Sequence, residues 1–141
     1  MQGIWRRVVF VTLYEGIAIA CTSVGLASAT GGSDKAAAAA MVAVGSSVVA
    51  VLWNLVFNWL FERWESGQAT RGRGLGRRVA HALGFEGGLA VFLIPLVAWG
   101  MGVSLLEAFW LDLGLLVFFL VYTFVFNWAF DRIFGLPASA A

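Results

Sequence analysis

The sequence predicts an all-α integral membrane protein, a four-helix bundle made of two tandem, parallel helix-pair repeats. Three observations lead to this fold. Hydrophobic residues make up 61% of the 141 residues and charged residues 12%, about half the charged share of a soluble domain. Four apolar stretches are each long enough to cross the hydrocarbon core of a bilayer, which is about 30 Å thick. The second half of the chain repeats the pattern of the first.

The apolar stretches cover residues 8–29, 36–61, 79–99 and 103–130. Each should be a helix, because lipid offers no hydrogen bonds to an unpaired backbone. Turn-like segments at residues 31–34, 66–74 and 100–102 connect them. We therefore expect a first transmembrane helix pair at 1–66, a cytoplasmic loop at 67–74 and a second pair at 75–141.

The first stretch also has features of a secretory signal peptide. Two arginines precede the apolar run, and Ala27-Ser28-Ala29 resembles a cleavage site. However, Glu15 lies within the run, where a signal peptide disfavours charge. The repeat also pairs this stretch with an internal one, so we interpret it as a retained helix.

Basic residues predict the orientation of the chain in the membrane. Lys35 is the one basic residue in the connection between the first and second apolar stretches. The other eight basic residues lie at the two termini and in the central loop: Arg6, Arg7, Arg63, Arg71, Arg73, Arg77, Arg78 and Arg132. Both termini and the central loop should therefore be cytoplasmic in a bacterial inner membrane.

The internal repeat appears when the chain is compared with itself. At an offset of 71, residues 7–16 fall on 78–87, with matching arginine, aromatic, glutamate and glycine positions. At an offset of 69, residues 53–63 fall on 122–132 and share the pattern Phe-Asn-Trp-x-Phe-acid-Arg. An even number of spans separates the two units, so they run parallel, unlike the inverted repeats of many transporters.

Glu15 is the residue that most strongly indicates a function. It lies eight residues beyond Arg7, about 12 Å along a helix, where a charge costs at least about 2.5 kcal/mol. Desolvation favours the protonated carboxyl group, so Glu15 could take up and release a proton near neutral pH. The structural alternative is an interhelical hydrogen bond, with Thr12 or Thr22 on the same face as partners.

Glu86 is the repeat partner of Glu15 and should lie at the same depth. His81 and Arg78 precede it on the cytoplasmic side. His81 aligns with Phe10, so one repeat alone carries a histidine. It could relay protons or make a structural hydrogen bond at the helix end.

A polar stripe runs along the second helix of each repeat. The stripes contain Asn54, Asn58 and Glu62 in the first repeat, and Thr123, Asn127 and Asp131 in the second. Aromatic residues run beside them: Trp53, Phe57, Phe61, Tyr122, Phe126 and Phe130. Amides and aromatic rings suit an organic cation, although amides also join transmembrane helices and aromatics gather at membrane interfaces.

Two further acids, Glu107 and Asp112, open the last apolar stretch. We expect them at the external interface or at an exit mouth. With one cysteine and one histidine, the chain has too few ligands for a Cys/His zinc site, and no catalytic triad or phosphate loop is recognisable. The sequence predicts no cofactor, no metal, no nucleic-acid partner and no enzymatic activity.

Four signatures in order resemble the proteobacterial antimicrobial compound efflux family, also described as bacterial transmembrane-pair proteins. They are Arg7 to Gly16, Trp53-Asn54 to Asn58, Arg78 to Gly87, and Phe126-Asn127 to Asp131. The resemblance covers nearly the whole chain. It implies a proton-driven exporter of biocides such as chlorhexidine, quaternary ammonium compounds and acridine dyes, with short diamines as natural substrates.

The resemblance also assigns individual residues. The proton-coupling glutamate of the family matches Glu15, and its second-repeat signature matches Arg78, His81, Phe85, Glu86 and Gly87. The sequence departs from the family pattern at Tyr14, where phenylalanine is also common, and at Asn58-Trp59 and Glu62, where an asparagine-then-aspartate ending is usual. These departures bear on substrate range.

We therefore predict a proton-coupled antiporter for lipophilic organic cations, working as a parallel homodimer. Glu15 and Glu86 would couple protons. The predicted substrate-binding residues are Tyr14, Glu15, Trp53, Asn54, Phe57, Asn58, Phe85, Tyr122, Phe126 and Asn127. The predicted relay or gate residues are Glu62, Arg78, His81 and Asp131. The alternative is a small membrane scaffold, or an accessory subunit, that transports nothing.

Overall fold

The computed structural model describes residues 2–70 and 72–136 and confirms the predicted all-α four-helix membrane bundle. Its elements are α1 (Gly3–Thr30), the short 3-10 helix η1 (Gly32–Lys35), α2 (Ala36–Ser66), α3 (Leu75–Met101) and α4 (Leu105–Phe134). The described residues contain no β-strand. Arg71 of the predicted loop, the last five residues of the predicted second pair and Met1 lie outside the described residues.

The four α-helices are longer than the apolar stretches that predict them, by up to five residues at the ends with many arginines and acids. A charged side chain at the water boundary does not stop a helix, so hydropathy underestimates helix length. The predicted connection at 100–102 is wrong by two residues. α3 continues through Gly100 and ends at Met101, and the residue that follows it, Gly102, has a left-handed φ of 65°. Ser104 caps α4 by accepting a hydrogen bond from the Glu107 N–H at 3.1 Å.

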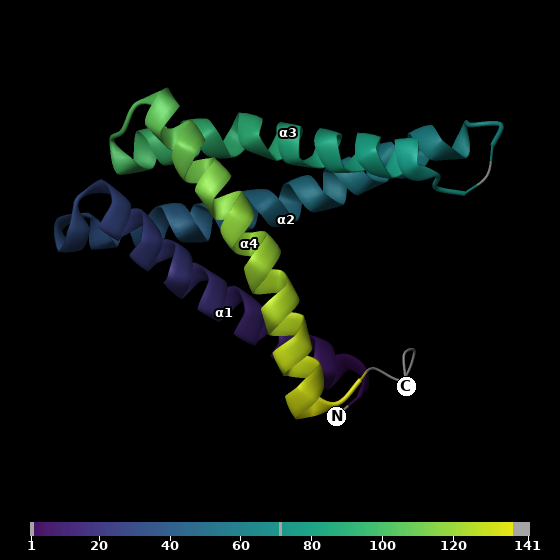
Figure 1. The fold of residues 1–141 in the computed structure, drawn as a ribbon, viewed down its shortest axis with the longest axis horizontal. Coiled ribbons are helices and arrows are strands. Elements are labelled where there is room, and N and C mark those ends of the chain that lie inside the picture. The colour runs from purple at the N-terminus through teal and green to yellow at the C-terminus, as the bar shows by residue number, and fades with distance from the viewer. Residues whose placement is uncertain (1, 71, 137–141) are drawn as a thin grey trace.

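The helices form two diverging legs, as Figure 1 shows. At one end, which we call the closed end, η1 joins α1 to α2 and residues 102–104 join α3 to α4. From there α1 and α4 converge toward the chain termini, whereas α2 and α3 run side by side toward the loop at 67–74. Each leg thus combines the first helix of one predicted repeat with the second helix of the other.

The buried core lies at the closed end. Its members come from all four α-helices: Leu26, Ala27, Ala39, Val42, Val97, Met101 and Ala108. The Lys35 ammonium donates a hydrogen bond to the Met101 carbonyl at 2.7 Å and ties η1 to the end of α3. The legs are therefore held together at this end and separate toward the other.

Most large apolar side chains outside this core point outward. Leu55, Leu83 and Val91 each expose about two thirds of their surface. In water such a surface would be unstable, whereas lipid solvates it at no cost. All four α-helices have the length and hydropathy of a membrane span, so the chain is a multi-pass membrane protein.

Candidate functional site

A cavity of about 880 Å³ lies between the two legs and is lined by all four α-helices. From α1 and α3 its wall takes Tyr14, Glu15, Ala18, Ile19, Thr22, Phe85, Glu86, Leu89, Ala90 and Leu93. From α2 and α4 it takes Ala43, Ser46, Ser47, Ala50, Val51, Asn54, Asp112, Leu115, Leu116, Phe119, Leu120, Thr123, Phe124, Asn127 and Trp128. Among the residues that the structure describes, the wall holds three carboxylates and no basic side chain.

Glu15 is half-buried on the cavity wall and accepts a short hydrogen bond from the Ser47 hydroxyl of α2. The predicted partners Thr12 and Thr22 do not make this bond. Ala18, Ile19 and Thr22 follow Glu15 at helical spacing, so one face of α1 turns toward the cavity. Ser47 orients the carboxylate. The signal for this role in the sequence was no more than a small polar residue in an apolar helix.

Glu86 faces the same cavity from α3, and Asp112 faces it from α4. The two acids are close enough for their charges to interact. Within the described residues neither makes a hydrogen bond or an ion pair. Sequence reasoning did not place Asp112 in the site. The signal in the sequence that could have placed Asp112 in the site was an acidic residue seven positions after the start of a mostly apolar helix.

Other polar groups in the wall join α1 to α4. The Tyr14 and Thr123 hydroxyls share a hydrogen bond of 2.8 Å between the two helices, and within α4 the Asn127 amide donates to the Thr123 carbonyl at 2.7 Å. Asn54 lines the opposite leg. Five of the predicted binding residues therefore line the cavity, namely Tyr14, Glu15, Asn54, Phe85 and Asn127, together with the predicted proton-coupling residue Glu86.

The other predicted binding residues lie between the helices of a leg. In the α2–α3 leg, Phe57 packs edge-on against His81 and Phe85, with ring centroids 5.1 and 5.7 Å apart. The Asn58 side-chain oxygen lies 2.8 Å from His81 Nε2. Trp53 Nε1 donates to the Phe85 carbonyl at 2.9 Å.

The α1–α4 leg is built in the same way. Phe126 packs against Phe10 and Tyr14, with ring centroids 5.2 Å apart in both cases. The Tyr122 hydroxyl donates to the Tyr14 carbonyl at 2.7 Å. The Asp131 carboxylate forms an ion pair with the Arg6 guanidinium, with 2.5 Å between its oxygen and the nitrogen of Arg6. The same guanidinium lies 4.8 Å from the centre of the Phe130 ring.

Contacts in the two legs fall on positions that the sequence repeat matches. The donors Trp53 and Tyr122 are 69 residues apart, and the carbonyls that accept from them, those of Phe85 and Tyr14, are 71 residues apart. The packed rings of Phe57 and Phe126 are also 69 residues apart. The cavity wall has the same property. Its five α1 residues match its five α3 residues at an offset of 71, and its six α2 residues match six of α4 at 69. The tandem repeat stays our interpretation of the sequence, and these coincidences support it.

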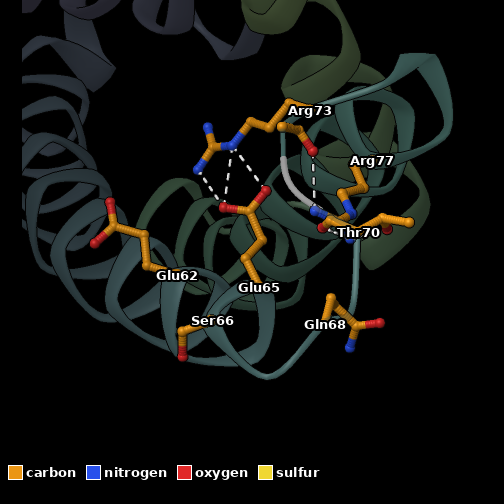
Figure 2. Close-up of a pocket in the computed structure, with 8 residues that line it drawn as sticks. Glu62, Glu65, Ser66, Gln68, Thr70, Arg73 and Arg77 are labelled. Carbon is orange, nitrogen blue, oxygen red and sulfur yellow. Dashed lines mark hydrogen bonds and ion pairs between the residues drawn. The ribbon is translucent and has the colours of Figure 1, made fainter.

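The remaining predicted gate residues lie by the loop at 67–74. Glu62 lines a pocket of about 300 Å³ there (Figure 2). Arg73 donates three hydrogen bonds of 2.8–3.1 Å to Glu65, which raise the pKa of the guanidinium above its usual range. Arg77 donates to Thr70, and Arg78 to the Arg73 carbonyl. These bonds close the loop on itself, and the relay or gate role of Glu62 and Arg78 stays a prediction.

The sequence profile of the chlorhexidine efflux transporter family matches residues 2–67 and 73–136. The chain belongs to this family. The family expected from the four signatures is therefore confirmed, and the protein is an efflux transporter embedded in a membrane by its four apolar helices. The matched segments cover α1 with α2, and α3 with α4.

Relatives of this efflux transporter carry a more specific name. A protein of Vibrio parahaemolyticus is 37% identical over 91% of this chain and 89% of its own length, and one of Acinetobacter baumannii is 36% identical over 91% and 87%. A protein of Acinetobacter baylyi is 46% identical over 62% of this chain and 61% of its own. All three are called short-chain diamines transporters. No solved structure matches the chain.

Proposed function

We propose that this protein is a proton-coupled antiporter that exports organic cations, with short-chain diamines as the first substrate class. The observation that carries the proposal is the cavity between the legs, whose wall holds three carboxylates and no basic side chain. A cavity of about 880 Å³ is within the range of small-molecule sites, about 300–1,000 Å³. The names of the relatives support diamines as substrates.

Glu15 is the proposed coupling residue. When it releases its proton toward the cytoplasm, the carboxylate becomes a binding site for a cation, and Ser47 holds it toward the cavity by its hydrogen bond. The rings of Tyr14 and Phe85 line the same cavity and can attract the cation through their faces. Protonation of Glu15 from the outside then displaces the cation, so one carboxyl group couples the two fluxes.

Glu86 is the proposed second coupling residue, since a diamine carries two charges. Exchange of one proton for a dication would export one net positive charge against an inside-negative potential, at about 2.3 kcal/mol per 100 mV. Exchange of two protons would move no net charge. Two glutamates at matched positions in one cavity provide two proton sites.

Larger organic cations are also proposed as substrates: chlorhexidine, quaternary ammonium compounds and acridine dyes. The cavity wall is mostly apolar and includes Phe119, Phe124 and Trp128, which can stack on flat aromatic cations. The family name supports chlorhexidine as one of them.

We also propose the orientation and the assembly. The arginines of the termini and of the loop at 67–74 favour a cytoplasmic position for these segments in the bacterial inner membrane. The legs then diverge toward the cytoplasm, and the core at the closed end lies on the outer side. Four helices form a thin wall around a drug-sized cavity, which favours a parallel homodimer.

The test is export from energised cells that express the wild type or Glu15→Gln at equal levels. Glutamine keeps most of the hydrogen-bonding capacity of glutamate but cannot titrate. We expect the wild type to lower accumulation of ethidium and of labelled 1,4-diaminobutane, a protonophore to abolish this effect, and Glu15→Gln to lack it. No effect of the wild type on any cation would refute the proposal and favour a scaffold. Full activity of Glu15→Gln would refute the role of Glu15.

A further inference from the structure

Asp112 is an acid of the cavity that the cycle above does not use. It extends from α4 into the same cavity as Glu86, and the charges of the two groups interact. The position matched to Asp112 in the first repeat is Ala43, which also lines the cavity. The second repeat therefore has an additional carboxylate that the first repeat lacks.

The level of Asp112 along the bundle follows from its neighbours. In the first repeat, Ser47 of α2 lies at the level of Glu15, to which it donates a hydrogen bond. The repeat matches Ser47 to Leu116 and Glu15 to Glu86. Leu116 therefore marks the level of Glu86 on α4. Asp112 precedes Leu116 by four residues, about 6 Å toward the closed end. The two carboxylates are thus separated along the cavity by about the length of an alkyl chain of four to five single bonds.

A second polar group at this level lacks a partner. Thr22 is 5% exposed and lines the cavity, yet its hydroxyl oxygen has no hydrogen-bond partner within the described residues. It lies eight residues from the closed end of α1, and Asp112 lies seven residues from the closed end of α4. A buried hydroxyl without a partner is costly, and an ammonium group beside Asp112 would supply one.

We infer that Asp112 binds the second ammonium group of a short alkyl diamine whose first group is held by the coupling glutamates, Glu15 and Glu86, and that Thr22 accepts a hydrogen bond from it. This inference rests on the proposed export function and adds a specificity residue to it. A monocation uses one acid and does not need Asp112, whereas a dication of matching length uses both. Asp112 thereby sets the preference for diamines and for their length.

The experiment compares export of 1,4-diaminobutane with export of ethidium by purified protein in proteoliposomes. For Asp112→Asn, the ratio of diamine to ethidium export should fall by about tenfold or more, because one ammonium group loses its counter-charge. The matched control is Glu107→Gln, an acid on the same helix outside the cavity, for which the ratio should stay as in the wild type. Thr22→Val should lower the ratio in the same direction by a smaller factor.

A length series distinguishes a specificity role from a merely structural one. Asp112→Glu keeps the charge and extends it by one methylene group, so the preferred diamine should become shorter. An unchanged ratio in Asp112→Asn, or an equal loss of both substrates in folded protein, would overturn the inference. If the wild type exports ethidium but no diamine, the inference fails while export stands. If it exports neither cation, the proposed function itself fails.

Discussion

At the scale of single residues, the contact that matters most joins Glu15 to Ser47. A carboxylate within the membrane needs a hydrogen-bond donor, and Ser47 is the donor that α2 supplies. The matched residue in the second repeat, Leu116, has no hydroxyl, so Glu86 lacks this donor. The two glutamates therefore occupy different environments although their positions match.

This asymmetry leads to a prediction for Ser47→Ala. A hydrogen bond to a charged group contributes about 1.5–3 kcal/mol, so its loss should lower the initial rate of cation export by about tenfold. Ser47→Thr keeps the hydroxyl and should retain most of the rate. Export assays in proteoliposomes at equal protein content measure both. Equal rates for the alanine variant and the wild type would show that Ser47 does not position Glu15.

The sequence was sufficient to find Glu15 and Glu86 as residues of the cavity wall, because an acid in the middle of an apolar stretch faces a cavity or a partner and not lipid. It was not sufficient to find Asp112 as part of the cavity. Asp112 lies seven residues from the start of α4, and from hydropathy alone that position is compatible with the membrane interface. Only the inclination of the helices, which depends on packing across the bundle, turns it toward Glu86.

At the scale of elements, aromatic side chains pack between the two helices of each leg. The sequence identified the aromatic and polar stripes of α2 and α4 but not which neighbour each stripe meets. Trp53 and Phe57 contact α3, whereas Tyr122 and Phe126 contact α1. Of the stripe residues of α2, Asn54 alone lines the cavity. Lipid and protein interior are equally apolar, so hydropathy cannot distinguish the face that packs from the face that contacts lipid.

Two adjacent glycines in α3 test the packing of the α2–α3 leg. A Cβ atom at Gly88 would overlap the Trp53 ring, whereas one at Gly87 would meet no atom within 4 Å. The ring cannot move freely, because it bonds the Phe85 carbonyl and contacts Phe92. Gly88→Ala should therefore lower the free energy of unfolding by about 1–3 kcal/mol.

Gly87→Ala is the control, since it makes the same chemical change one residue away. It should be neutral or slightly stabilising, because alanine favours a helix over glycine by up to about 1 kcal/mol. Unfolding of both variants in detergent, followed by tryptophan fluorescence, gives the comparison. Equal stability of the two variants would contradict the α2–α3 contact described here.

At the scale of the whole molecule, the legs meet at the closed end and diverge toward the termini and the loop at 67–74 (Figure 1). The sequence predicted the number of spans, their order and the tandem repeat, because length, hydropathy and self-similarity are local properties. It did not predict that each leg would combine helices from both halves. In the α1–α4 leg, that pairing depends on contacts between residues more than 100 positions apart, such as Arg6 with Asp131.

The proposed orientation gives a prediction for accessibility. With Cys21 replaced by alanine, Ser33→Cys in η1 should react with a membrane-impermeant thiol reagent in intact spheroplasts. Ala69→Cys in the central loop should react only after the membrane is permeabilised, because the arginines hold this loop in the cytoplasm. The reverse pattern would invert the orientation and place the divergent end of the legs outside.

The measurement that tests the central claim most directly follows proton and diamine together. Proteoliposomes contain a pH-sensitive dye, 1,4-diaminobutane is added outside, and protein-free vesicles correct for permeation of the uncharged amine. We expect the lumen to become more alkaline as the diamine enters, with two protons leaving for each dication, no net current, and no response in Glu15→Gln. Diamine uptake without any movement of protons would contradict the account.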